Sequence, residues 1–322
     1  MTKKNVLYVK DLNKTYSKNS SKSVHAIKNL NLEVKEGEIF GLLGPNGAGK
    51  STFINILAGT TIKTSGEVNV WGFNLDINPR QVRASIGIVP QEVNVDPFFT
   101  PWNILELQAG MYGIKKKDRI TETILKLVSL DQQSKSYTRS LSGGMKRRLL
   151  VAKALVHKPP IIILDEPTAG VDVELRTNLW NNIKQLNKQG VTIILTTHYL
   201  NEAEQMCDRI GILNKGNLVA LDTTENLLKR VKTKIVKFTV NKKVNIDNSS
   251  LKSIKIISNE MNELEVSYDK NSLNINEIIK FINEQNIDLL DISPSSVEIS
   301  CKSTFLSFIN LIISLIFREF FS

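Results

Sequence analysis

The sequence predicts an α/β protein built on a buried parallel sheet, followed by a smaller α+β domain. Three apolar runs that end in polar residues are typical of parallel strands covered on both faces: GEIFGLLG (37–44), IIILD (161–165) and VTIILTTH (191–198). Helical stretches separate these runs, which is the alternation expected of α/β architecture. At about 150 residues per domain, the 322 residues predict two domains.

Pattern and composition divide the chain into three regions. Residues 1–220 hold the strand–helix alternation, and a helix-rich segment at about 95–157 interrupts it as an inserted helical subdomain. Residues 221–302 hold four alternating strand patterns around one helical stretch, which predicts an accessory α+β domain of ferredoxin-like type. Residues 303–322 form an apolar tail.

The composition is that of an ordinary globular protein. Hydrophobic residues make up 41% and charged residues 23%, and two cysteines cannot form a disulfide framework. The first residues lack the apolar stretch of a signal peptide, and no run of 18 apolar residues predicts a membrane span. These observations exclude secreted, collagenous and multispan membrane proteins, and we expect a soluble intracellular protein.

The net charge of +10 is concentrated in one stretch. Between Lys229 and Lys255 there are nine basic residues and one acid, Asp247. A solvated lysine-rich face is the favoured interpretation. Contact with an anionic membrane surface is the second alternative, and contact with nucleic acid is the weakest.

The first motif that carries chemistry is a glycine-rich loop between a predicted strand and a predicted helix. Its residues are Gly44, Pro45, Asn46, Gly47, Ala48, Gly49, Lys50, Ser51 and Thr52. They fit G-x-x-x-x-G-K-[ST], in which backbone N–H groups surround a di- or triphosphate and the helix N-terminus faces the same anion. Lys50 is expected to reach the β- and γ-phosphates, and the Ser51 hydroxyl is expected to ligate Mg²⁺.

The second motif places two carboxylates at the end of a buried strand. Asp165 ends the run IIILD, where ligands of open α/β sheets bind, and can hold Mg²⁺ opposite Ser51. Glu166 follows and can polarise an attacking water. The pair therefore favours hydrolysis over transfer of phosphate to an organic acceptor.

The third motif is a second helix start that can bind phosphate. In LSGGMKRRL (141–149), Ser142, Gly143 and Gly144 open a helical run about 90 residues after the first loop. The two helix starts need not face the same nucleotide within one copy. A C₂ dimer would close each nucleotide between the first loop of one copy and the serine–glycine helix of the other.

These motifs, together with Gln91 in VPQE and the TTH sequence, occur in the order and spacing of an ABC transporter ATPase subunit. The chain resembles the ABC-2-type exporters, closest to the YadG-type ATPases. The resemblance implies a P-loop (RecA-like) ABC ATPase core, the cofactors ATP and Mg²⁺, and ATP hydrolysis as the activity.

The resemblance also implies roles for individual residues. Tyr16 matches the aromatic that stacks on adenine, and Gln91 matches the residue that touches Mg²⁺ or its water and senses the γ-phosphate. Residues 142–144 match the signature that contacts the partner's γ-phosphate. Asp172 matches an aspartate at the dimer interface, and His198 matches the histidine that contacts the γ-phosphate. The other two histidines match no motif and are interpreted as structural: His25 and His157.

Expected partners follow from the same resemblance. They are a second copy of the chain and a separate ABC-2-type membrane permease, with no nucleic acid. The location is then cytoplasmic, peripheral on the inner face of the plasma membrane. The cargo depends on the permease. An ABC-type ATPase in translation or DNA repair is the alternative, but those proteins carry two cassettes or long coiled-coil insertions. A nucleotide-binding regulator without turnover is disfavoured by the intact Lys50, Asp165, Glu166 and His198.

Two apolar features leave alternatives open. Phe98, Phe99 and Trp102 follow Gln91 and either belong to the core of the helical subdomain or line a docking groove for a permease helix. The tail 303–322 has its polar residues on one narrow helical stripe. It is interpreted as packing against the body or a partner, dipping into a membrane interface, or a divergent end with no role.

Overall fold

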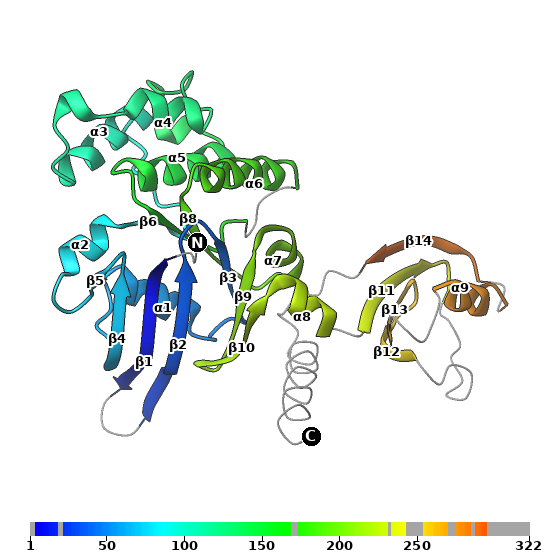
Figure 1. Cartoon of the computed structure of the whole chain (residues 1–322). Coiled ribbons are helices and arrows are strands. Elements are labelled where there is room, and N and C mark those ends of the chain that lie inside the picture. Colours follow the sequence, from blue (N-terminus) through cyan, green and yellow to red (C-terminus); the bar gives the residue numbers. More distant parts are fainter. Residues whose placement is uncertain are drawn as a thin grey trace. The chain divides into compact units, whose positions relative to one another are not determined.

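A computed structural model describes two compact units of the chain. The first comprises Met1–His198 with Glu202–Thr224, and the second comprises Tyr199–Asn201 with Glu225–Ser322 (Figure 1). The residues that it describes are 4–18, 22–168, 173–230, 233–242, 254–269, 275–284 and 287–294. The predicted apolar tail at 303–322 lies outside them.

A six-stranded sheet forms the centre of the first unit. Its order is β10 (Asn217–Thr223), β9 (Arg209–Asn214), β3 (Ile39–Leu43), β8 (Thr192–Thr197), β7 (Ile161–Asp165) and β6 (Ile86–Val89). All neighbours pair in parallel except β10, which runs antiparallel to β9. Every residue of β3 and β8 is buried, which confirms the prediction of parallel strands covered on both faces.

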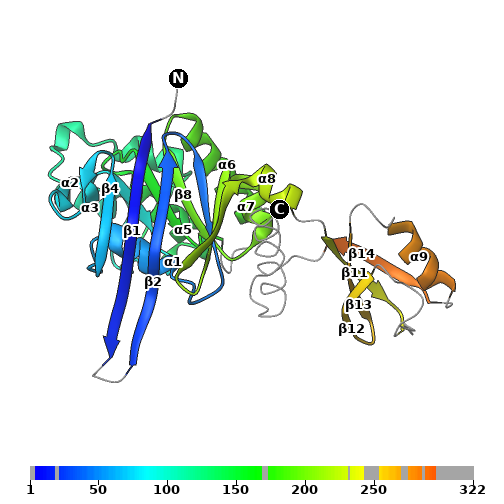
Figure 2. The ribbon, with the colours of Figure 1, turned by 60° about the horizontal axis from the view of Figure 1, so that its bottom comes forward.

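A second, antiparallel sheet belongs to the same unit. Its order is β2 (Lys22–Lys35), β1 (Asn5–Lys18), β4 (Ser65–Val70) and β5 (Phe73–Asn74). The long strands β1 and β2 lie side by side along the unit (Figure 2). Their inward positions are apolar and buried, including Val9, Leu12, Leu30 and Leu32.

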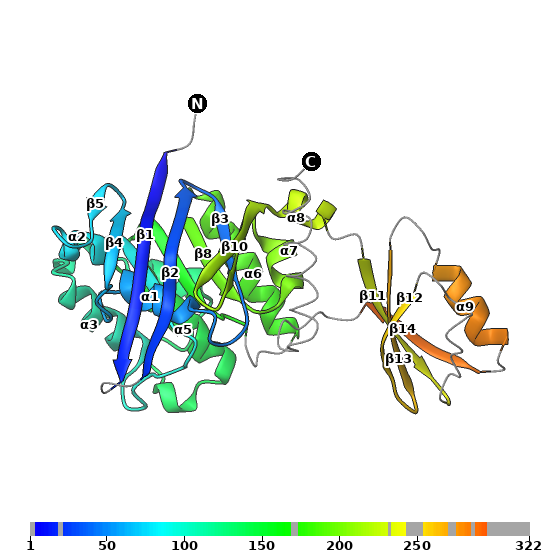
Figure 3. The same ribbon diagram turned by 90° about the horizontal axis from the view of Figure 1, so that it is seen from below.

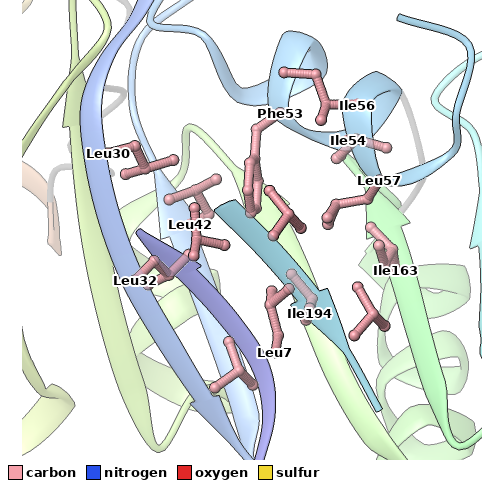
Figure 4. Close-up of a cluster of buried hydrophobic side chains, with 14 of the residues drawn as sticks. Leu7, Leu30, Leu32, Leu42, Phe53, Ile54, Ile56, Leu57, Ile163 and Ile194 are labelled. Carbon is pink, nitrogen blue, oxygen red and sulfur yellow. The ribbon is translucent and has the colours of Figure 1, made fainter. Parts of the chain in front are cut away.

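The helix α1 (Lys50–Leu57) joins the two sheets through a shared core. Phe53, Ile56 and Leu57 on this helix are almost completely buried. They meet Leu7, Leu30 and Leu32 from the antiparallel sheet and Leu42, Ile163 and Ile194 from the parallel sheet (Figure 4). Each such side chain contributes about 1.5–3 kcal/mol by its burial. The helix that follows the glycine-rich loop is therefore firmly anchored.

Helices occupy the region between β6 and β7 where the helical insertion was predicted. They are α3 (Pro101–Met111), α4 (Thr121–Leu127) and α5 (Gly143–Leu155), which lie together in Figure 1. Thr100 and Ser142 begin α3 and α5, because each side chain accepts a backbone N–H of the first turn. The remaining helices are α2 (Pro79–Ala84), α6 (Val173–Lys188), α7 (Leu200–Met206) and α8 (Thr224–Arg230). No helix in the described ranges is long and apolar enough to cross a membrane.

The second unit contains an antiparallel sheet with a helix on one face (Figure 3). The sheet order is β12 (Ile254–Asn259), β13 (Glu263–Asp269), β11 (Thr233–Val240) and β14 (Leu289–Pro294), and the helix is α9 (Ile275–Glu284). This strand order is that of a ferredoxin-like sheet, with one of its two helices present in the described ranges. Phe238, Leu264 and Ile282 lie in its core. Lys237 of the lysine-rich stretch is paired, with its Nζ 2.7 Å from Glu263 Oε2.

Candidate functional site

The carboxyl ends of four parallel strands meet at one edge of the six-stranded sheet. β3 leads into the glycine-rich loop and β6 into Gln91. β7 leads into Asp165 and Glu166, and β8 leads into His198. Ligands of open α/β sheets bind outside this edge. The parallel pairing thus gathers residues that are far apart in the sequence.

The backbone of the glycine-rich loop requires its glycines. Gly47 and Gly49 have φ angles of 79° and 112°, in the region that side chains disfavour. A Cβ at Gly49 would lie 2.5 Å from the carbonyl oxygen of Ala26, and one at Gly44 would lie 2.3 Å from that of Leu213. The loop is therefore packed closely against β2 and β9. It ends at the N-terminus of α1, where unpaired N–H groups can bind an anion.

The ammonium group of Lys50 is buried beside this loop. Its Nζ donates to the carbonyl oxygens of Gly44 at 2.6 Å and Pro45 at 3.3 Å. It also lies 3.2 Å from Oε1 of Glu166. The side chain is 5% exposed, so its charge is held in a fixed place at the mouth of the loop. A lysine held in this way is suited to bind phosphate oxygens as a point charge.

The carboxylate of Glu166 is the centre of the site. Its Oε1 faces Lys50, and its Oε2 accepts a hydrogen bond from Nε2 of Gln91 at 3.2 Å. The same Oε2 lies 3.2 Å from Nδ1 of His198. The four residues predicted to carry the chemistry are thus brought together around one buried carboxyl group.

The backbone at Glu166 is strained. Its φ of 44° lies in the left-handed region, which is rare for a residue with a long side chain. Its N–H donates to both the carbonyl oxygen and Oγ1 of Thr196, each at 3.1 Å. Such conformations occur at functional sites and persist because the surrounding contacts hold them.

Asp165 provides an oxygen ligand suited to a cation. Its Oδ1 accepts a hydrogen bond from Oγ1 of Thr196 at 2.6 Å. Burial raises the pKa of this carboxyl above its ordinary value, although the Thr196 hydrogen bond opposes the shift. A carboxylate that loses hydration in this way gains from a nearby cation. The oxygens of Asp165, Ser51 and Gln91 are the hard donors that Mg²⁺ prefers. The described part of the chain holds no group of three or more His, Cys, Asp or Glu residues that could hold a metal ion.

A cavity of about 580 Å³ opens beside the glycine-rich loop. Residues 45–52, Gln91 and Glu166 line one part of it. The other lining residues come from β1, β2 and the β9–β10 turn: Tyr16, Val24, His25, Ala26, Lys28 and Lys215. Tyr16 is 39% exposed, with Nζ of Lys14 4.5 Å from the centre of its ring, and its aromatic ring lies at the cavity where a flat ligand such as a purine could stack. The cavity is therefore bounded by an aromatic ring, a phosphate-binding loop and a carboxylate.

The two histidines without a predicted role differ in position. His25 lines the cavity, and its Nδ1 lies 3.0 Å from Oγ1 of Thr15. His157 stacks on Tyr112 with ring centroids 3.8 Å apart, and its Nε2 lies 3.0 Å from the carbonyl oxygen of Ile86. His157 thus makes a packing contact, whereas His25 is available to a ligand.

The serine–glycine segment lies apart from this cavity. Ser142 begins α5 and its Oγ accepts the N–H of Met145 at 3.3 Å. Ser142 and Gly143 are exposed, and neither they nor Gly144 line the cavity. Asp172, predicted at a dimer interface, lies outside the described residues.

Two residues that hold the catalytic segments in place, Thr196 and Arg147, carry no predicted role. Thr196 bonds both Asp165 and Glu166, and the hydroxyl of the TTH motif at a strand end could have indicated this. Arg147 is buried behind the Glu166 backbone. The sequence gives no signal for it, because its partners are backbone carbonyls distant in the chain.

Comparisons with known proteins agree with this geometry. A profile described as ABC transporter matches residues 27–169. The chain is 39% identical over 229 residues to the linearmycin resistance ATP-binding protein LnrL of Bacillus subtilis, covering 70% of this chain and 72% of that protein. It is 38% identical over 220 residues to the Nod factor export ATP-binding protein I of Rhizobium etli, covering 68% of each chain.

Solved structures are similar as well. The ATP-binding subunit of an ABC transporter superposes with a TM-score of 0.62 at 28% identity, covering 70% of this chain and 92% of that one. A dimeric ATP-binding cassette in a post-hydrolysis state, bound to ADP and phosphate, superposes with a TM-score of 0.60 at 29% identity. That match covers 68% of this chain and 98% of the other.

Replacing Asp165 by Asn should stabilise the ligand-free protein at neutral pH. A raised pKa means that the folded state binds the Asp165 proton more tightly than the unfolded state does, so the ionised group lowers stability above that pKa. Asn removes the charge and can still accept the Thr196 hydrogen bond. We expect a melting temperature a few degrees higher near pH 7.5, and a smaller difference as the pH falls toward the acidic range.

Thermal unfolding of both proteins at several pH values measures this effect. Asp131→Asn, at an exposed surface position, is the matched control and should change little. A variant that is less stable than the parent at neutral pH would contradict the assigned electrostatic cost.

Proposed function

Because the chain belongs to the ABC transporter family of ATP-binding proteins, we propose that it is the ATPase subunit of an ABC-2-type exporter. One observation carries this proposal. The carboxyl ends of four parallel strands bring Lys50, Gln91 and His198 around the buried carboxylate of Glu166, beside a phosphate-binding loop. This arrangement supports hydrolysis of a nucleoside triphosphate held in the cavity.

The proposed nucleotide contacts follow from the cavity lining. Tyr16 stacks on the adenine, the backbone N–H groups of residues 46–52 surround the phosphates, and Lys50 binds the β- and γ-phosphates. Ser51, Asp165 and Gln91 would hold Mg²⁺, which would supply charge neutralisation at the phosphates. Lys50 then exchanges its contacts with loop carbonyls and Glu166 for phosphate oxygens.

Glu166 is proposed as the general base. Its carboxylate takes a proton from the water that attacks the γ-phosphorus, and Gln91 and His198 fix its orientation through contacts at Oε2. His198 also donates to the γ-phosphate and stabilises its developing charge. The contact of Oε1 with Lys50 places this carboxyl group beside the glycine-rich loop.

Replacing Glu166 by Gln tests this role directly. The amide retains the shape of the side chain but cannot accept a proton, so turnover should fall by about 10²–10⁴-fold. Binding of ATP should remain nearly unchanged, and trapped ATP should hold a dimer together in gel filtration. Steady-state hydrolysis and a fluorescent ATP analogue provide the two measurements. Hydrolysis at the parent rate would remove Glu166 from this role.

Gly143, the first residue of the helix α5, supports a dimer that is held together by bound nucleotide. Apart from its chain neighbours and its own helical turn, a Cβ at Gly143 would meet no heavy atom within 4 Å, and the φ of Gly143 is not positive. Neither packing nor backbone conformation within the subunit therefore requires glycine there. Close approach of an external group, such as the γ-phosphate bound to a partner, accounts for the small residue. The similar cassette solved as a dimer is consistent with this arrangement.

Mixing two inactive variants tests the shared site. Lys50→Ala removes the phosphate-binding lysine, and Ser142→Arg blocks the start of α5. Neither homodimer has a functional site. The mixed dimer retains one complete site, which combines the glycine-rich loop of the Ser142→Arg chain with Ser142 of the Lys50→Ala chain. We expect ATPase activity to reappear on mixing and to depend on total protein concentration. Absence of any recovery would reject the shared-site arrangement.

A separate membrane permease is the proposed partner, and it would hold the chain at the cytoplasmic face of the membrane. The relatives named for Nod factor export and linearmycin resistance support a role in export. Phe98 is 71% exposed, and Phe99 and Trp102 are 38% and 39% exposed. These exposures favour the docking interpretation of the three aromatics over the core interpretation, because large exposed apolar side chains often mark partner sites.

Replacing Phe98 by Ser should weaken binding to the permease without affecting the isolated ATPase. The side chain buries little surface within the subunit, so the loss should fall on the interface. Ile77→Ser is the control, because Ile77 is 77% exposed in another part of the first unit. Recovery of a multispan protein with each tagged variant, identified by mass spectrometry, is the measurement. Equal recovery with Phe98→Ser and with the parent would place the docking site elsewhere.

A further inference from the structure

Arg147 is a residue of α5, the helix that begins at Ser142 and is called the signature helix below. Its side chain reaches the segments at the catalytic edge of the sheet. It lies in the second turn of α5, three residues after Gly144, and is 5% exposed. Its guanidinium donates to five backbone carbonyl oxygens. These are Pro167 (from Nε, 3.0 Å), Pro90 and Gln91 (from Nη1, 2.8 and 2.7 Å), and Glu166 and Asp165 (from Nη2, 2.9 and 3.4 Å).

These acceptors belong to two separate segments of the site. Pro90 and Gln91 follow β6, whereas Asp165 ends β7 and Glu166 and Pro167 follow it. One planar group therefore joins the segment that carries Gln91 to the segment that carries the general base. A guanidinium has a rigid set of diverging donors, which a lysine ammonium cannot reproduce.

Burying the charged guanidinium of Arg147 away from water costs free energy. Burial lowers the pKa of the guanidinium, and nearby Asp165 opposes the shift. The charge is solvated by peptide dipoles instead of water. A core leucine or methionine would avoid burying the charge but would leave these carbonyl oxygens without donors, so hydrogen bonding and not apolar packing accounts for an arginine here.

The contact with Glu166 fixes a strained peptide. Thr196 holds the N–H of Glu166, and Arg147 holds its carbonyl oxygen. The left-handed φ of 44° is thus held on both sides of the residue. A shift of this peptide would move the carboxylate relative to Lys50, Gln91 and His198.

We propose that Arg147 is a positioning residue that orients Glu166 and Gln91 together and links them to the helix that begins at Ser142. Movement of the signature helix is in this way transmitted to the base through carbonyl contacts. The inference rests on the proposed role of Glu166 in hydrolysis. It extends that role to a residue that does not line the cavity.

Arg147→Ala is the first variant, and Arg148→Ala is its matched control. Arg148 is the next residue of the same helix, but its Nη1 donates to the carbonyls of Val128 and Ser129, within the helical insertion. We expect kcat of Arg147→Ala to fall roughly 10–100-fold, the effect of a misplaced catalytic group. Binding of a fluorescent ATP analogue should remain near the parent affinity, and Arg148→Ala should hydrolyse ATP at close to the parent rate.

Chemical rescue separates positioning from general structural support. Free guanidinium can occupy the space that Arg147→Ala leaves and donate to the same carbonyls. Guanidinium chloride, far below denaturing concentrations, should restore part of the lost kcat. Sodium chloride at equal ionic strength should not restore it. Arg147→Lys retains the charge but not the geometry, and should give an intermediate kcat with unchanged nucleotide affinity. Arg147→Lys tests the proposal if Arg147→Ala does not fold.

The outcomes distinguish this inference from the proposed function. Parent-like kcat in Arg147→Ala, while Glu166→Gln is inactive, would overturn the role of Arg147 and leave the role of Glu166 intact. Parent-like kcat in Glu166→Gln would overturn the base assignment itself. Equal losses of kcat and nucleotide affinity in Arg147→Lys, without rescue of Arg147→Ala by guanidinium, would show that Arg147 only supports the fold.

Discussion

The parallel pairing of β3, β8 and β7 is the constraint on which the site depends. Thr196 of β8 lies opposite Leu42 of β3 on one side and Asp165 of β7 on the other. In this register its hydroxyl reaches both Asp165 and the N–H of Glu166. A slip of one residue would turn Thr196 to the other face of the sheet and withdraw both hydrogen bonds. The central strand thus fixes the two acidic residues relative to the glycine-rich loop.

Charged groups at this edge are buried, and the fold compensates them with short-range partners. Lys50 and Glu166 neutralise each other, and the Lys50 ammonium also binds loop carbonyls. Arg147 is surrounded by carbonyl oxygens, and Asp165 has one hydroxyl donor. Removing either Lys50 or Glu166 would leave the other charge buried and uncompensated, which costs more than the pair itself contributes. The site therefore combines the left-handed backbone of Glu166, the raised pKa of Asp165 and the buried Lys50–Glu166 ion pair. All three lie at the end of a sheet whose strands are buried.

Local patterns were sufficient to predict much of this structure, and tertiary contacts explain what they missed. The glycine-rich loop was predictable because positive φ angles and phosphate binding both require glycine at fixed positions. The buried strands were predictable because their apolar runs differ from amphipathic helices.

Arg147 could not be predicted, because its acceptors are backbone atoms whose identity leaves no trace in the sequence. The antiparallel sheet of β1, β2, β4 and β5 was not assigned, since long strands with many polar residues resemble loops. The position of His25 on the cavity wall could not be predicted either, because a histidine on a strand reveals nothing of the cavity beside it. The predicted roles of Asp172 and of the tail at 303–322 remain predictions.

The rim of the cavity has a consequence for how its ligand arrives. Lys28 and Lys215 are both exposed, and both line the opening beside the phosphate loop. The β9–β10 turn that carries Lys215 is tied to the loop, since the N–H of Gly216 donates to the carbonyl of Ala48 at 2.9 Å. Exposed charges act through solvent, and their field is screened within roughly 8–10 Å at physiological ionic strength. They therefore attract a polyanion during diffusion but contribute little once it is seated among buried groups. Ionic strength would thus change the association rate of the nucleotide, whereas its dissociation rate would depend on the buried contacts at Lys50 and the glycine-rich loop.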